Sequence, residues 1–168
     1  MIVYLVRHAA PKEPFYSGFP GPPLGEHGQL QAQRIGAFLQ KKQVDLVFSS
    51  DYIRTLQSLA HYQQLTQKKV HIAKELRERE NLIETHDSLV YRVQNWFENF
   101  LNSHSENMVI FSHCGPINMI LSYLDPDQTL MDYPYSCEFL CLTPKAGIWE
   151  LELEDARLLS GRLVLACC

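Results

Sequence analysis

Short apolar segments rich in β-branched residues alternate along this chain with longer segments of helical periodicity. The apolar segments cover residues 2–6, 44–48, 70–73 and 108–111. Apolar residues recur at helical spacing over residues 30–39, 53–60, 89–101 and 117–124. Parallel strands need long crossovers, and helices supply them. The alternation therefore predicts an α/β fold, a three-layer α/β/α sandwich with a mostly parallel central sheet.

The pattern changes after Ser136. Residues 137–143 and 147–154 have the composition of strands, and a turn at Pro144 joins them. We expect these segments to add an antiparallel edge strand to the sheet. A length of 168 residues suits one domain, and no repeat or linker divides the chain. The sequence thus predicts a single domain over residues 1–168.

Charge and hydropathy argue against several classes of partner. A net charge of −4 provides no basic surface for nucleic acid. No apolar stretch approaches the roughly 20 residues of a membrane helix, and the first apolar run is too short for an export signal. Five cysteines without metal-site spacing are typical of reduced thiols. We therefore expect a cytoplasmic protein that binds neither nucleic acid nor membrane.

Arginine and histidine residues follow the strands at the edge of the sheet where ligands bind. In open α/β sheets this edge is formed by the carboxyl ends of the parallel strands. Arg7 and His8 follow the first strand. Arg54 lies in the first turn of the helix after the second strand, and His113 follows the fourth. We expect these four side chains to meet at one site.

The chemistry of these four side chains indicates a phosphate site. Arginine presents a charged fork of donors that matches phosphate oxygens, and a helix start adds free backbone N–H groups. Unprotonated histidine is a nucleophile near neutral pH, and its attack on phosphorus divides one displacement into two easier steps. Arginines repel cations, which argues against a metal held by His8 and His113. The residues predict a site without metal or other cofactor.

Six segments carry a resemblance to a known family. They are "VRHAAP", "PLGEHGQLQAQ", "VDLVFSSDYIRTLQSLA", "ELRERE", "ETHDSLVYRVQNWFENFL" and "VIFSHCGPI". In their order and spacing they resemble the histidine phosphatase superfamily, also called phosphoglycerate-mutase-like, in its small phosphatase branch. The resemblance extends from about residue 2 to residue 124 and continues weakly into "YSCEFLCL".

The resemblance implies a role for each candidate residue. His8 would be the nucleophile that becomes phosphohistidine, and Arg7 and Arg54 would bind the phosphoryl group. His113 would be the second histidine, which stabilises the transferring phosphate. Glu78, in "LRE", would donate a proton to the leaving oxygen, for which burial must raise its pKa. The charge run "KELRERE" also offers Glu75 and Glu80 as rivals for this role.

The resemblance also narrows the activity. Mutases of this kind carry a substantial insertion before the second histidine, whereas only a short segment and one helix separate Glu78 from His113 here. We therefore expect a metal-independent phosphomonoesterase acting on a phosphorylated small molecule or a phosphoprotein. The alternatives are a phosphohistidine-protein phosphatase, a phosphoglycerate-type mutase, and a phosphate-binding domain without catalysis.

Two segments leave the substrate open. Ala9 replaces the usual glycine after the histidine, and "AAPKEPFYSGFPGPP" lacks the Thr-x-x-Asn type of sequence that holds sugar phosphates in several members. Phe15, Tyr16 and Phe19 in this stretch either line a substrate entrance or cover the sheet edge as core. Ser49 and Ser50 are interpreted as turn and helix-capping residues.

Overall fold

The computed structural model describes residues 1–16, 18–80, 83–130, 132 and 143–165. These residues fold around one mixed β-sheet. Within these residues the sheet has six strands in the order β3-β2-β4-β1-β5-β6. Their bounds are β1 (Ile2–Arg7), β2 (Leu46–Ser49), β3 (Val70–Ile72), β4 (Met108–Ser112), β5 (Ile148–Glu154) and β6 (Arg157–Leu165). Strands β3, β2, β4 and β1 pair in parallel, whereas β5 is antiparallel to both β1 and β6.

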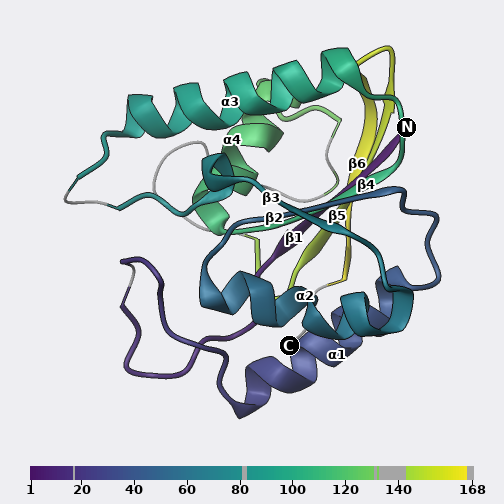
Figure 1. Ribbon diagram of the computed structural model, residues 1–168. Helices are drawn as coiled ribbons and strands as arrows, with labels where there is room; N and C mark the ends of the chain where they lie inside the picture. Colours follow the sequence, from purple (N-terminus) through teal and green to yellow (C-terminus); the bar gives the residue numbers. More distant parts are fainter. Residues whose placement is uncertain (17, 81–82, 131, 133–142, 166–168) are drawn as a thin grey trace.

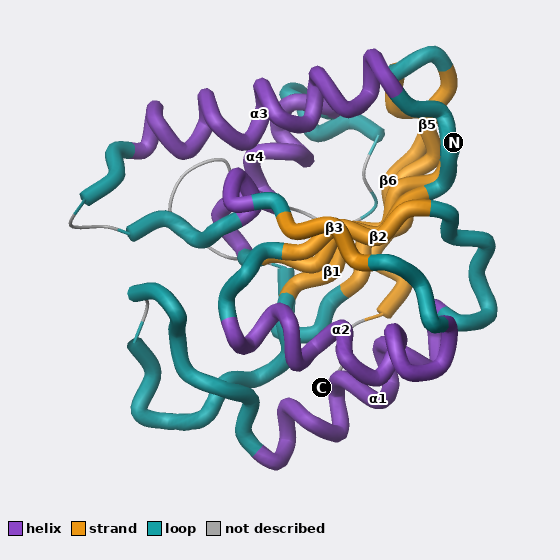
Figure 2. Tube along the Cα trace, viewed as in Figure 1, coloured by secondary structure: helices purple, strands orange, loops and turns teal. Residues whose placement is uncertain are grey.

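The helices form a layer on each face of this sheet (Figure 1). Their bounds are α1 (Glu26–Leu39), α2 (Ile53–Thr66), α3 (His86–Ser103) and α4 (Cys114–Leu124), with a short 3₁₀ helix at Lys74–Leu76. Figure 2 shows α1 and α2 on one side of the strands and α3 and α4 on the other. The predicted α/β/α architecture is confirmed.

The antiparallel edge includes β6, a strand that the sequence did not predict. The tight turn between β5 and β6 has positive φ at Asp155 and Ala156. β6 escaped prediction because it is the outer strand and is exposed at many of its positions, which weakens its hydrophobic pattern. Of the strand predicted for residues 137–143, all but Thr143 lies outside the described residues.

Side chains of β1 alternate between two cores. Val3 and Leu5 pack in the core shared with α3 and α4. Tyr4 and Val6 pack in the core shared with α1 and α2. Strand β4 is buried at every position because helices cover both of its faces. The ends of these central strands are therefore held rigidly.

The carboxyl ends of β1, β2 and β4 are level with one another. Arg7 of β1 is paired with Ser112 of β4, and Ser49 of β2 is paired with Phe111 of β4. The next residue also follows the sheet, since the His8 N–H donates to the Ser112 carbonyl at 3.0 Å. Residues that directly follow these three strands are thereby brought to one edge.

Candidate active site

His8 is fixed by its own backbone and by two neighbouring segments. Its N–H donates to Ser112, and its carbonyl accepts from the Ala146 N–H at 3.1 Å. The ring Nδ1 lies 2.8 Å from the Ala9 carbonyl oxygen. A carbonyl only accepts hydrogen bonds, so Nδ1 carries the proton. The lone pair is then on Nε2, the nitrogen available for attack.

Burial keeps both histidines neutral. Burial first, and then the charge of Arg54, lower the pKa of His8 to about 3. Burial likewise lowers the pKa of His113 well below its usual value, with His8 and Arg54 adding to the effect. The two ring centroids are 5.1 Å apart. A neutral imidazole next to a second neutral imidazole is a suitable arrangement for nucleophilic attack and hydrogen-bond donation.

His113 is held between two residues of the β2–α2 connection. It is fully buried and directly precedes α4. Its Nε2 lies 3.0 Å from the Ser50 hydroxyl, and the edge-on Tyr52 ring has its centroid 4.9 Å away. Within the described residues Nδ1 is buried without a partner. Ser50 therefore orients His113. The N-cap of α2 is Tyr52, and no side chain caps this helix, so the capping role expected of Ser49 and Ser50 is wrong.

Arg54 is a buried cation whose guanidinium has no hydrogen-bond partner among the described residues. Its side chain is fully buried, and none of Nε, Nη1 and Nη2 bonds to another described residue. The Tyr52 ring lies 4.5 Å from its Cζ. Gly21, at φ +77°, passes so close that a Cβ there would lie 2.2 Å from Nη1. Leaving a buried charge unpaired is costly, so this guanidinium is suited to bind an anion.

Arg7 is anchored at the end of β1 by the turn that precedes β5. Its Nη1 donates to the Thr143 carbonyl at 2.5 Å, and its N–H donates to the Gly147 carbonyl at 3.0 Å. Its Nε is buried without a partner among the described residues. Arg7 therefore keeps donor capacity for a ligand at the same edge as Arg54.

The surroundings of the Glu78 carboxyl raise its pKa. Its Oε1 accepts from the N–H groups of Arg79 at 3.1 Å and Gly115 at 3.2 Å. Burial raises the pKa of Glu78 above its usual value, although these hydrogen bonds and the charges of Arg54 and Arg7 oppose the shift. A Cβ at position 115 would lie 2.4 Å from Oε1, so a larger residue there would displace this carboxyl. A carboxyl whose pKa is raised, with two arginines nearby, suits proton donation.

The two rival carboxylates have other surroundings. Glu80 accepts from the Tyr52 hydroxyl at 3.0 Å and from the Phe19 N–H at 3.3 Å, so it ties the loop before α1 to the site. Glu75 is exposed. The structure thus separates the three glutamates that the charge run leaves equivalent.

Ser58 is a residue that the sequence did not single out. Its hydroxyl donates to the Arg54 carbonyl at 2.6 Å and accepts from the Ala9 N–H at 2.8 Å. Since the Ala9 carbonyl in turn accepts from His8, Ser58 connects the arginine helix to the nucleophile. Its place one helical turn after Arg54 was the available signal.

The aromatic residues before α1 border the site. The exposed fractions of Phe15, Tyr16 and Phe19 are 48%, 52% and 49%. Phe15 has its ring centroid 5.5 Å from the Arg54 Cζ, and Phe19 packs edge-on to Tyr52 at 5.5 Å. These distances favour the entrance over the core, the two positions that the sequence left open.

Other groups near the site have structural explanations. Cys114 is buried and disulfide-bonded, which corrects the expectation of reduced thiols at this position. Nowhere in the described ranges do three or more His, Cys, Asp or Glu side chains gather to hold a metal ion. Across the same ranges, every helix is too short or too polar to cross a membrane.

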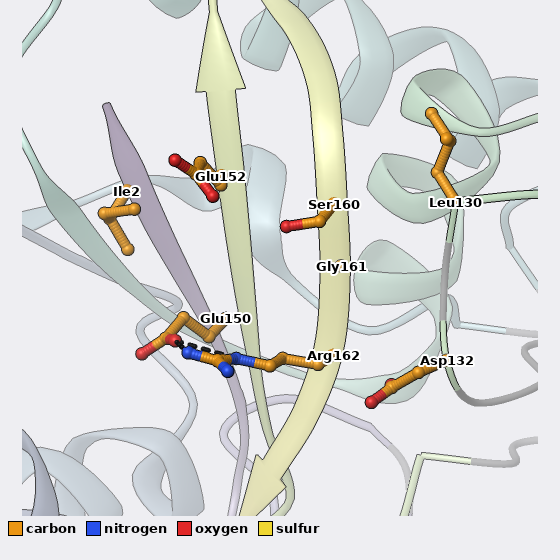
Figure 3. Close-up of a pocket in the computed structure, with 8 residues that line it drawn as sticks. All are labelled: Ile2, Leu130, Asp132, Glu150, Glu152, Ser160, Gly161 and Arg162. Atoms are coloured by element: carbon orange, nitrogen blue, oxygen red, sulfur yellow. Dashed lines mark hydrogen bonds and ion pairs between the residues drawn. The ribbon is translucent and has the colours of Figure 1, made fainter.

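A separate surface groove lies over β5 and β6 (Figure 3). Glu150 and Glu152, which line it, pair with Tyr4 and Ile2 in the first half of β1. The groove is therefore displaced along the sheet from the strand ends that carry His8.

Residues 3–83 match the model of the histidine phosphatase superfamily (branch 1). No curated protein matches the chain. Among solved structures, the alpha-ribazole phosphatase of Shigella flexneri is similar, with a TM-score of 0.76, 19% identity, and coverage of 99% of this chain and 96% of that chain.

Two other solved structures are similar to this chain over nearly its whole length. A mycobacterial glucosyl-3-phosphoglycerate phosphatase has a TM-score of 0.71 and 16% identity, covering 98% of this chain and 97% of its own. A phosphoglycerate mutase of Bacillus anthracis str. Sterne has a TM-score of 0.74 and 15% identity, covering 94% of this chain and 90% of its own. At these identities, the similarity establishes the fold over nearly the whole length.

Proposed function

We propose that the chain is a histidine phosphatase, a hydrolase of phosphate monoesters that needs no metal and works through a phosphohistidine on His8. The observation that carries this proposal is the fully buried guanidinium of Arg54, which has no hydrogen-bond partner in the described part of the chain, near a neutral His8. A phosphoryl group supplies the missing anion, and the imidazole supplies the nucleophile.

The first half-reaction transfers the phosphoryl group to the protein. Arg54 and Arg7 bind its oxygens and stabilise the charge that develops on them. His8 Nε2 attacks phosphorus, so a P–N bond forms while the P–O bond to the leaving group breaks. Glu78 gives its proton to the leaving oxygen, which departs as an alcohol.

The second half-reaction releases phosphate. Water attacks the phosphorus of the phosphohistidine, and the Glu78 carboxylate accepts the proton of that water. The P–N bond breaks, its electron pair returns to Nε2, and inorganic phosphate leaves. His113, oriented by Ser50, donates a hydrogen bond to the phosphoryl oxygens in both halves.

The length of the chain between the acid and the second histidine supports net hydrolysis. Between Glu78 and His113 the described residues form α3 and β4 with short connections. Retention and re-transfer of a phosphoryl group require an enclosed site. The described residues of this stretch contain no inserted element that would enclose it. Water therefore reaches the phosphohistidine.

The proposal is tested with p-nitrophenyl phosphate in the presence of EDTA. We expect His8→Ala to lower turnover by at least about 1,000-fold, EDTA to have no effect, and His27→Ala to retain activity, since His27 is exposed on α1. Wild-type turnover in His8→Ala would exclude His8 as the nucleophile. Loss of activity with EDTA would exclude a metal-independent mechanism.

A further inference from the structure

Two phenylalanines beside the site are each backed by a guanidinium. The Cζ of Arg54 lies over the Phe15 ring at 5.5 Å, and the Cζ of Arg77 lies over the Phe19 ring at 4.3 Å. About half of each phenylalanine side chain is nevertheless exposed. Each ring thus has a cation against one face and a large exposed surface, and Phe19 also packs edge-on to Tyr52.

Hydrogen bonds hold this loop in place. The Phe19 N–H donates to Glu80, and the Phe15 N–H donates to the Glu13 carboxylate at 2.8 Å. The Pro20 carbonyl accepts from the first N–H of α2, that of Ile53, at 3.0 Å. The bonds to Glu80 and Ile53 tie Phe19 and Pro20 to the rest of the protein, which lowers the entropic cost of stacking on the Phe19 ring.

The environment of the rings selects a type of partner. A cation against one face of an aromatic ring draws electron density toward itself. The rest of the ring then favours a flat, electron-rich group, and offset stacking supplies more energy than contact with a puckered group of equal size. Because Arg54 also binds the phosphoryl group, a group stacked on Phe15 must be joined to that phosphoryl group by a short linker.

We propose that Phe15 and Phe19 form a leaving-group subsite for a flat aromatic moiety, so that the substrates are phosphate monoesters of aromatic alcohols or nucleosides. This inference rests on the proposed function, and it names the substrate class of the same site. The stacked group accounts for the exposure of two large apolar side chains at the entrance.

The first test compares benzyl phosphate with cyclohexylmethyl phosphate. The two leaving alcohols are similar in acidity and size, and differ in whether the ring is flat. We expect kcat/KM to favour benzyl phosphate by about 5-fold to 10-fold. The second test compares adenosine 5′-monophosphate with ribose 5-phosphate, which share the leaving oxygen and differ in the base. We expect the nucleotide to be preferred by about 10-fold.

Substitutions assign the preference to the subsite. Phe15→Leu and Phe19→Leu keep apolar bulk and remove the flat ring, so both ratios should approach one. Tyr91→Leu is the control, because Tyr91 is an exposed aromatic residue of α3 and lies outside the proposed subsite. Each ratio compares two substrates on one protein preparation, so it is independent of the folded fraction.

The outcomes separate this inference from the proposed function. Equal rates within both substrate pairs, or ratios that survive both leucine variants, would overturn the subsite. A benzyl preference without a nucleotide preference would support the subsite and assign it to aromatic alcohols. Turnover of p-nitrophenyl phosphate that depends on His8, with none of the four esters hydrolysed, would overturn the subsite alone. No turnover of any ester would overturn both proposals.

Discussion

Two buried charged residues of this molecule, Glu150 and Arg54, have opposite surroundings. Around Glu150, on β5, every charge is paired. The carboxylate accepts from Lys42 at 2.9 Å and from the Arg162 Nε at 3.0 Å, as Figure 3 shows for Arg162. Around Arg54, at the carboxyl ends of the parallel strands, the guanidinium has no partner among the described residues.

The difference distinguishes a structural cluster from a binding site. Lys42 and Arg162 offset the desolvation of Glu150, so that cluster is complete without a ligand. In the proposed function, a bound phosphoryl group completes the Arg54 cluster. Removing a charge should therefore affect stability in the first cluster and activity in the second.

The largest expected effect comes from one substitution in each cluster, compared by its effect on activity and on stability. Arg54→Met should lower kcat/KM for p-nitrophenyl phosphate by about 1,000-fold without lowering the free energy of unfolding, because it removes an unpaired buried charge. Glu150→Gln should lower the free energy of unfolding by about 2 kcal/mol and leave kcat/KM within about 2-fold. Urea denaturation and steady-state kinetics measure both. A stability loss in Arg54→Met equal to that in Glu150→Gln would break the comparison.

A second contrast lies between Glu78 and Glu80. On an alkyl phosphate, whose leaving group needs a proton, Glu78→Gln should lower kcat by about 100-fold, and Glu80→Gln by only a few-fold. On p-nitrophenyl phosphate, whose leaving group departs as an anion, the effect of Glu78→Gln on the first half-reaction should largely vanish. Single-turnover kinetics on the two substrates measure this. The same loss on both substrates would exclude Glu78 as the proton donor.

The two clusters should also titrate in different pH ranges. In the unfolded chain His8 takes up a proton below about pH 6.5, whereas in the folded chain its pKa is about 3. Between these values the unfolded state binds more protons, so stability falls as pH falls. The slope contributed by His8 should approach about 1.4 kcal/mol per pH unit, and His113 should add to it.

The carboxylate cluster responds only at lower pH. Burial raises the pKa of Glu150, but hydrogen bonds from Lys42 and Arg162 outweigh burial, and the net shift is downward. Its contribution is therefore lost below the ordinary glutamate range. In urea denaturation between about pH 6.5 and pH 4.5, His8→Ala should flatten the slope and Glu150→Gln should preserve it. An unchanged slope in His8→Ala would contradict the neutral, buried state of this histidine.

The smallest expected effect concerns the connection through Ser58. Ser58→Ala leaves the Ala9 N–H unpaired and loosens the carbonyl that sets the His8 tautomer, so kcat should fall by about 10-fold. Thr66→Ala is the matched control on α2, since its hydroxyl also bonds to the carbonyl four residues earlier and contacts no site residue. Steady-state kinetics at several pH values measure the two variants. Equal losses of kcat would reduce Ser58 to a structural role.

The sequence predicted the frame of the molecule and the residues that follow directly from it. Alternation of strands and helices implies a parallel sheet, and a parallel sheet brings residues after its strands to one edge. Arg7, His8 and His113 were placed in this way. Local order along the chain was sufficient for these residues because the backbone register determines their positions.

The sequence could not predict contacts that depend on packing between distant segments. It could not separate Glu78 from Glu80, because only the approach of Gly115 and the Tyr52 hydroxyl distinguishes their environments. Ser58 was missed for the same reason, since its partner Ala9 is 49 residues away. The Glu150 cluster likewise depends on Lys42, which is 108 residues away in the chain.

The central claim is that His8 carries the phosphoryl group. Rapid chemical quench with ³²P-labelled phosphate monoester, followed by peptide mapping under alkaline conditions, tests it most directly. The account predicts label on His8 that forms and decays within one turnover, survives alkali and is lost in acid, with none in His8→Ala. Turnover without labelled protein, or an acid-stable label on another residue, would contradict it.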